Sequence, residues 1–284
     1  MARSRLMIIP LQSTPRAWQP LTPRGVAAFA GAKLARLLTV QFVFAALTAA
    51  TVVWFLHTGW FPIVRESIRQ LPSRGEIRSG HLNWAGPSPQ ALGAGNFLAI
   101  AVDLKHEGAV RSPAHVQIEF AREDVRIFSL FGYIEVGYPK HLTLPFNRPE
   151  LEPWWGAWEP PILWMAAGVV IVGMMAVWAL LATLYFEWVW LAGFFANRNL
   201  DGPASWKLAG AALMPGALLM DAGIAGYGLG VFDPVKLLVI AGAHLAAGWA
   251  YLLVSPFLVP KLPSGAGGKR NPFAFHARGN SRER

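Results

Sequence analysis

Four long apolar stretches constrain this chain more than any other feature of its sequence. They cover residues 37–56, 162–186, 208–232 and 237–258, and the first two contain no charged residue. A helix needs about 20 predominantly apolar residues to cross a bilayer, and within one segment only a helix satisfies every backbone hydrogen bond in lipid. Only 14% of the residues are charged, against about 25% in soluble domains. The sequence therefore predicts an integral membrane protein built on four transmembrane helices.

Basic residues gather at the two ends of the chain. Residues 1–36 carry six Lys or Arg and no acid, and residues 259–284 carry six against one acid. Residues 57–159 carry ten against eleven acids. Positively charged flanks stay in the cytoplasm, so we expect both termini to be cytoplasmic in a multi-pass protein of the bacterial inner membrane. The net charge of +9 then reflects topology and attraction to lipid headgroups, and we expect the lipid bilayer, not nucleic acid, as its partner.

The expected organisation follows from these spans. Its segments are a cytoplasmic basic N-terminal segment 1–36, transmembrane helix 37–56, an extracytoplasmic β-rich domain 57–160, transmembrane helix 161–196 with a cytoplasmic extension, a cytoplasmic loop 197–207, transmembrane helices 208–232 and 233–258, and a basic cytoplasmic tail 259–284. The first span is expected to be an uncleaved anchor, because its apolar core is longer than the ~7–15 residues of a signal peptide.

Proline beside a capping residue marks several helix ends. Thr22-Pro23 and Asp233-Pro234 each combine an N-cap with proline at the first helical position. Pro160-Pro161 is expected to open the second span, and the Asn-, Gly- and Pro-containing run 197–203 to end it near Ala196.

Between the first two spans the pattern changes from continuously apolar to alternating. Strands are predicted at 77–82, 97–104, 116–120, 125–130, 133–138 and 141–146, with a short helix at 63–71 before them. Asp103 is expected to end a strand or order a turn, and Gly93-Ala94-Gly95 to form a flexible loop. The predicted fold class is thus a membrane α-helical bundle of four transmembrane helices with an inserted small antiparallel β-rich extracytoplasmic domain.

Asp221 and His244 are the candidate functional residues of the spans. A charge in the middle of a span costs at least ~2.5–3.5 kcal/mol, so Asp221 should face the bundle, pair or be protonated. His244 differs from it in depth by about 6 Å at 1.5 Å per residue, so the two side chains can meet across the helical hairpin. Such a pair can be a structural hydrogen bond, a proton relay or a cation site.

Spans three and four are rich in small residues. Gly216, Gly226, Gly230 and Gly242 take part in pairs of small residues four positions apart, a spacing that lets helix backbones approach closely in lipid. This spacing indicates helix packing within the chain or, alternatively, the contact face of a homo-oligomer or protein partner.

No set of residues indicates a reaction. The chain has no cysteine, which excludes disulfides, thiolate zinc sites and cysteine nucleophiles. His81, His106, His115 and His141 lack metal-ligand spacing, so they are interpreted as scattered surface residues. We therefore expect no catalytic residues, no metal and no cofactor.

The sequence resembles an uncharacterised bacterial four-span membrane family. The resemblance lies in Leu71-Pro72, Gly75, Ile77, Gly80 and Leu82, in the strand ending Ile100-Ala101-Val102-Asp103, and in Pro215 of the third span. It implies an extracytoplasmic β domain after the first span and three clustered spans after it. Some members of that family are described as maltodextrin-utilisation accessory proteins, and the resemblance implies no catalytic residue.

Three classes of function remain. The first is a non-enzymatic integral membrane protein whose outer β domain binds an envelope partner or serves as a subunit of a membrane complex. The second is a small transporter or transporter accessory subunit that uses Asp221 and His244. The third is a membrane enzyme acting on lipid or peptide, which would require a catalytic set that the sequence lacks.

Overall fold

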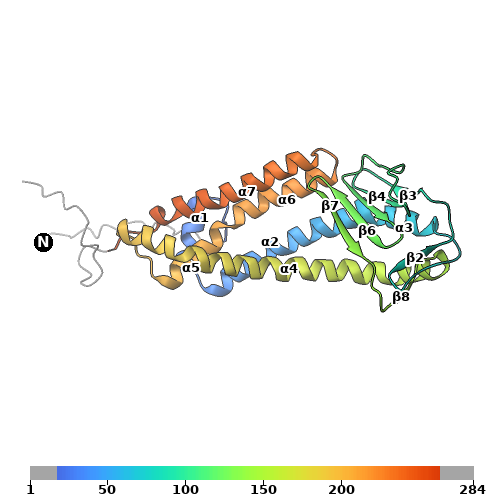
Figure 1. Cartoon of the computed structure of the whole chain (residues 1–284). Coiled ribbons are helices and arrows are strands. Elements are labelled where there is room, and N and C mark those ends of the chain that lie inside the picture. The colour runs from blue at the N-terminus through green and yellow to red at the C-terminus, as the bar shows by residue number, and fades with distance from the viewer. Residues whose placement is uncertain (1–17, 263–284) are drawn as a thin grey trace, which may run out of the picture. The chain divides into compact units, whose positions relative to one another are not determined.

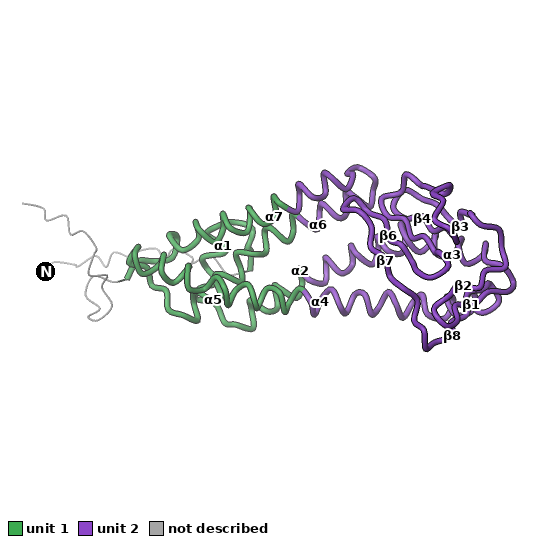
Figure 2. Tube along the Cα trace, in the orientation of Figure 1, with its two compact units in different colours: residues 1–44, 174–219, 242–284 green, residues 45–173, 220–241 purple. Residues whose placement is uncertain are grey.

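The computed structural model describes residues 18–262. The chain forms two compact units (Figure 2). Of the described residues, unit 1 comprises 18–44, 174–219 and 242–262, and unit 2 comprises 45–173 and 220–241. Residues 1–17 of the expected basic N-terminal segment and residues 263–284 of the expected basic tail lie outside the described residues.

Four helical segments among the described residues are long and apolar enough to cross a membrane. They are Leu34–Arg69, Arg148–Phe195, Gly202–Gly228 and Pro234–Leu258. Three of them contain a whole apolar stretch found in the sequence, and Gly202–Gly228 contains residues 208–228 of the stretch 208–232. The prediction of four long apolar helices is therefore confirmed at the level of helix length and composition.

Unit 1 contains short N-terminal helices packed on the start of the third apolar segment. Helix α1 (Pro23–Ala28) is capped as predicted, since the Gly25 amide donates to Thr22 Oγ1. The 3₁₀ helix η1 (Phe29–Gly31) then packs against α5 (Gly202–Ala212). Lys207 Nζ on α5 donates to the Ala32 carbonyl at 2.7 Å, which fixes this corner.

The helix of the third apolar segment is interrupted, a break that the sequence pattern does not predict. Helix α5 begins at Gly202, where Asp201 Oδ1 accepts from the Ala204 amide at 2.8 Å, so the predicted loop 197–207 shortens to 197–201. Helix α6 (Met214–Gly228) follows after Leu213. Pro215 explains the break, because it has no N–H to donate to the carbonyl four residues earlier.

The second apolar helix starts much earlier than expected. Helix α4 (Arg148–Phe195) has 48 residues, about 72 Å at 1.5 Å per residue, and runs through Pro153, Pro160 and Pro161. The expectation that Pro160-Pro161 opens this helix is therefore wrong. Asn147 caps the true start, since its Oδ1 accepts from the Glu150 amide at 3.1 Å.

The prolines are tolerated because the carbonyl groups that lose their hydrogen-bond donors lie on exposed backbone. Pro160 and Pro161 leave the carbonyls of Gly156 and Ala157 without their helical donors, and both residues are exposed. Glu159 also links this part of α4 to the first helical segment by ion pairs. Its Oε2 lies 3.4 Å from Arg65 Nε and its Oε1 lies 3.7 Å from His57 Nδ1.

The first apolar helix passes into the β domain without a loop. Helix α2 (Leu34–Phe55) continues through a π turn, η2 (Leu56–Trp60), into α3 (Phe61–Arg69), which corresponds to the predicted short helix. Helix α3 packs against two strands, β3 (Gln90–Ala94) and β4 (Leu98–Val102), as Figure 1 shows.

Two sheets form the β domain. The first has the order β2-β1-β8, from β1 (Gly75–Arg78), β2 (His81–Trp84) and β8 (Thr143–Pro145). The second has the order β3-β4-β5-β6-β7 and adds β5 (Val116–Phe120), β6 (Asp124–Ser129) and β7 (Gly132–Gly137). Their core includes Ile77, Leu82, Leu92, Leu98 and Val102.

Two local predictions for this domain are corrected by the structure. Residues 77–82 are not one strand, because β1 and β2 form a hairpin that turns at Ser79-Gly80 with φ values of 52° and 81°. Gly93 and Ala94 belong to strand β3 and are not a flexible loop. The pairing is otherwise mostly antiparallel, as predicted, with β4 and β5 paired in parallel through the crossover segment 103–115.

Candidate functional site

A wide groove lies on the three-stranded sheet of the β domain. It has a volume of about 1320 Å³ and is lined by β1, β2, β8 and the start of α4. Its basic side chains are Arg74, Arg78 and Arg122, its acidic ones Glu76, Glu123 and Glu150, with Trp84 and Asn83 beside them. A wall of both charges with an aromatic ring suits a polar, mixed-charge ligand.

Some of these charges are already paired and others are free. Arg78 Nη1 lies 3.8 Å from Glu76 Oε1, and His81 Nδ1 lies 3.7 Å from Glu123 Oε1. Among the charged groups of residues 18–262, none forms an ion pair with Arg74 or Arg122, and both arginines are exposed. These two guanidinium groups are therefore the ones in the groove that can receive an anionic group of a partner.

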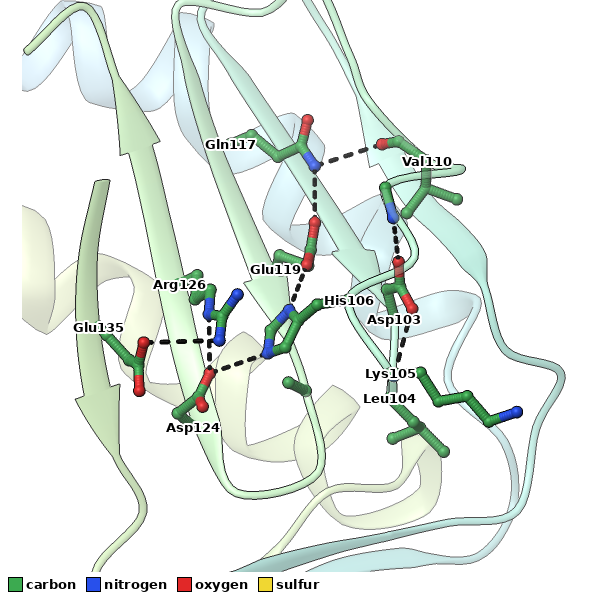
Figure 3. Close-up of polar contacts among 12 residues, drawn as sticks. Asp103, Leu104, Lys105, His106, Val110, Gln117, Glu119, Asp124, Arg126 and Glu135 are labelled. Carbon is green, nitrogen blue, oxygen red and sulfur yellow. Dashed lines mark hydrogen bonds and ion pairs between the residues drawn. The ribbon is translucent and has the colours of Figure 1, made fainter. Parts of the chain in front are cut away.

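A second feature is a buried polar cluster on one face of the five-stranded sheet (Figure 3). Glu119 on β5, Arg126 on β6 and Glu135 on β7 are directly opposed across the strands, which places alternating charges on one face. Arg126 Nη2 lies 3.5 Å from Glu135 Oε2, and Arg126 Nε lies 3.5 Å from Asp124 Oδ1.

His106 joins this cluster to the crossover segment. Its Nδ1 lies 2.6 Å from Glu119 Oε1, and its Nε2 lies 3.2 Å from Asp124 Oδ1. Its φ of 56° is in the left-handed region, which costs energy and turns the ring toward the two carboxylates. The interpretation of His106 as a scattered surface histidine is wrong, and only the doubly protonated ring can donate to both carboxylates at once.

Gln117 completes the buried end of the cluster. Its Nε2 donates to Glu119 Oε2 at 3.3 Å and to the Val110 carbonyl at 3.2 Å, and its Oε1 accepts from the Ser112 amide at 2.8 Å. Because Glu119 is only 2% exposed, these contacts are what allow a carboxylate to be buried there. The cluster therefore holds the crossover segment on the sheet, and none of its described members presents a nucleophile to His106.

Asp103 orders the start of the same crossover, as the sequence predicted. Its Oδ2 accepts from the Gly108 amide at 2.9 Å and its Oδ1 from the Lys105 amide at 3.3 Å. Burial opposes ionisation of this carboxyl, but the backbone amides of Gly108, Glu107 and Lys105 outweigh burial and lower its pKa.

His115 links the β domain to the end of helix α6 within unit 2. Its Nδ1 lies 2.8 Å from the Tyr227 hydroxyl oxygen, and the Tyr227 ring packs on Phe55 and Phe97 with centroids 5.4 and 5.0 Å away. His115 is thus also not a free surface residue. No sequence pattern indicates this contact, because it joins positions 112 residues apart.

The two candidate residues of the spans fall in different units. Asp221 on α6 belongs to unit 2, is 7% exposed, lies beside the Thr51 hydroxyl, and has a buried Oδ1 without a described hydrogen-bond partner. His244 on α7 (Pro234–Val254) belongs to unit 1, and its buried Nδ1 likewise has no described partner. The predicted contact between these residues stays a prediction.

The four glycines play different roles. A Cβ at Gly216 would overlap the His244 carbonyl oxygen, and one at Gly226 would overlap the Phe232 ring, so both glycines permit close packing. Gly230 instead ends the α6 region with a φ of 74°. A Cβ at Gly242 would meet no described atom within 4 Å. Close packing within the described chain therefore explains the need for glycine at Gly216 and Gly226, but not at Gly230 or Gly242.

A metal site is not formed by the histidines, aspartates and glutamates of residues 18–262. Comparison with known protein families, curated proteins and solved structures gives no match to this chain. The resemblance to the bacterial four-span family stays a prediction.

Proposed function

We propose that this chain is a non-enzymatic integral membrane protein of the bacterial inner membrane whose extracytoplasmic β domain binds an envelope partner through its groove. Four apolar helices and the basic ends of the chain support the membrane part of the proposal. The observation that carries the binding part is the groove of about 1320 Å³ with the free guanidinium groups of Arg74 and Arg122 in its wall.

The chemistry of the groove defines the kind of partner. Arginine at a partly desolvated surface binds carboxylates through two parallel hydrogen bonds, and Glu150 and Glu76 nearby accept from amino or amide groups. Trp84 adds an apolar contact, and its Nε1 already donates to the Pro87 carbonyl at 2.8 Å. A polypeptide segment that carries both charges, from a protein partner or a subunit of the same complex, fits this wall best.

The test compares charge reversal inside and outside the groove. Arg74→Glu/Arg122→Glu removes the free cations of the groove, whereas Lys140→Glu removes an exposed cation that does not line it. After cross-linking in native membranes, wild type and Lys140→Glu should retain the same partner, and the double variant should lose most of it. Equal recovery of the partner by all three proteins would contradict the proposal.

The membrane orientation has its own test. The chain lacks cysteine, so single cysteines at the exposed Ser73 and at Ser264 in the C-terminal tail report each side separately. In intact cells an impermeant thiol reagent should label Ser73→Cys and not Ser264→Cys. The reverse pattern, or labelling of both, would overturn the proposed topology.

The buried Oδ1 of Asp221, which has no hydrogen-bond partner among residues 18–262, supports a second candidate function, a small transporter or transporter accessory subunit. If Asp221 moves a proton or cation with His244, Asp221→Asn should abolish flux into proteoliposomes while abundance and folding are retained. If Asp221 is structural, Asp221→Asn should leave any flux unchanged, and Asp221→Leu should lower thermal stability.

A further inference from the structure

The β6–β7 hairpin ends in two large apolar side chains that no described residue covers. Leu130 and Phe131 connect Ser129 to Gly132 and are 52% and 82% exposed. On β7 itself Tyr133, Ile134 and Val136 are each at least half exposed. Elsewhere in residues 75–145, all of which are described, exposed large apolar side chains occur only at Leu142 and Leu144.

The geometry of the turn gives no reason for these two residues. Gly132 supplies the left-handed conformation with a φ of 109°, and Ser129 Oγ accepts from the Phe131 amide at 3.3 Å. Polar residues normally occupy such exposed turn positions. A contiguous exposed apolar tip on an ordered hairpin indicates a surface that becomes covered.

Aromatic and basic side chains lie next to the tip. Phe128 and Tyr133 form an aromatic pair with centroids 5.6 Å apart. The Arg111 guanidinium lies over the Phe128 ring, 4.6 Å from its centroid, and the Arg126 guanidinium lies 5.8 Å from the centroid of Tyr133. Exposed apolar side chains with aromatic rings and guanidinium groups beside them are the residue types found where acyl chains meet the headgroups of a bilayer.

The hairpin is also placed at a suitable level. Figure 1 shows the β6–β7 turn at the level of the connection between α6 and α7, and both belong to unit 2. That connection carries two exposed apolar side chains of its own, Leu229 and Val231. In a chain whose apolar helices cross a membrane, this level is where the spans leave the hydrocarbon.

We propose that the β6–β7 tip, residues 128–134, inserts into the outer leaflet of the membrane in which the helices lie. The proposal rests on the membrane part of the proposed function. Lipid fits better than a second copy of the chain, because Tyr133 and Ile134 lie on opposite faces of β7 and are both exposed. A strand added to the free edge of β7 would leave both faces uncovered, whereas lipid surrounds the whole tip.

The experiment uses the full-length chain, which is naturally free of cysteine. Phe131→Cys and the control Ser73→Cys are labelled with the environment-sensitive dye NBD and placed in nanodiscs that hold one copy. Discs of phosphatidylcholine, with and without phosphatidylglycerol, carry nitroxides at the headgroup, near the top of the acyl chain, or near its end. Apolar residues of interfacial segments reach about 5–10 Å into the headgroup–acyl boundary.

NBD at Phe131 should emit at shorter wavelength than NBD at Ser73 and be quenched most by nitroxides near the top of the acyl chain. Iodide in the water should quench only the dye at Ser73. Equal iodide quenching at both positions would overturn the proposal. Shielding that appears only when discs hold two copies, with disulfide formation under an added oxidant between unlabelled Phe131→Cys chains in matching discs, would assign the tip to a second copy instead. Failure of the proposed membrane insertion is separately visible, since neither protein would then enter the discs.

Discussion

Replacing His106 by alanine tests whether the buried polar cluster holds the crossover segment on the sheet. The change removes the imidazole that lies 2.6 Å from Glu119 Oε1 and leaves this carboxylate, 2% exposed, with Gln117 as its described side-chain partner. Breaking a buried pair by removing one partner costs about 3–5 kcal/mol, because the remaining charge is left in a poorly solvated place. The substitution costs less stabilising interaction at Asp124, because the Arg126 guanidinium remains beside this carboxylate.

The matched control is His81→Ala. His81 also lies beside a glutamate, with Nδ1 3.7 Å from Glu123 Oε1, but the two side chains are 55% and 70% exposed. An exposed pair of this kind contributes about 0–1 kcal/mol. The structure therefore predicts a gap of several kcal/mol between two substitutions with identical chemistry.

Hydrogen exchange in the full-length protein measures this gap directly, because amides of β5 and β6 report the local opening free energy. His106→Ala should speed their exchange far more than His81→Ala, and adding Glu119→Gln to His106→Ala should recover part of the loss by removing the unpaired charge. Equal exchange in His106→Ala and His81→Ala would refute the role assigned to the cluster.

Three further predictions concern other parts of the chain. Gly216→Ala should lower stability by about 1–3 kcal/mol, because its methyl group would overlap the His244 carbonyl, whereas Gly242→Ala should be neutral or slightly stabilising; unfolding temperatures in detergent compare them. Because the pKa of Asp103 is lower in the folded state than the unfolded value of 3.8, ionised Asp103 stabilises the β domain above pH 3.8, and this stabilisation is lost as the pH falls through the folded pKa. Asp103→Asn should therefore make the stability of the β domain, measured by circular dichroism, fall less steeply as the pH is lowered. Tyr227→Phe should cost about 0.5–1.5 kcal/mol by removing the bond to His115, seen as faster amide exchange at residues 115–118, and unchanged exchange would show that ring packing alone makes this link.

The sequence was most informative where structure follows from composition over a long window. The apolar helices can be predicted from the sequence because a continuous run of about 20 apolar residues is long enough to form a membrane-spanning helix and fits few other structures. Strand β5 was predicted with its observed bounds, because Val116, Ile118 and Phe120 alternate with polar residues. The caps at Thr22 and Asp233 were found because each is a local hydrogen bond between neighbouring residues.

The errors have physical causes that a single sequence hides. Pro160-Pro161 indicated a helix start, but a cap at Asn147 and ion pairs of Glu159 extend α4 past the prolines. Gly93 indicated a loop, yet its lack of a side chain is what lets β3 approach Ser67 and the Ile63 carbonyl on α3. The partners of His106 and His115 are set by the crossover and by pairing across distant segments, which residue spacing does not encode.

These tertiary features bear on how the β domain can act. Within unit 2 it is attached through α3, which continues α2 without a loop, and through the extended start of α4. Glu159 ties these two helices together, and the His115–Tyr227 bond adds a third attachment at the end of α6. A domain held at three places cannot swing freely on a linker. Its groove and its apolar hairpin tip therefore belong to one compact unit with the helix ends that carry these attachments, so a partner that occupies the groove and lipid that surrounds the tip would act on the same unit.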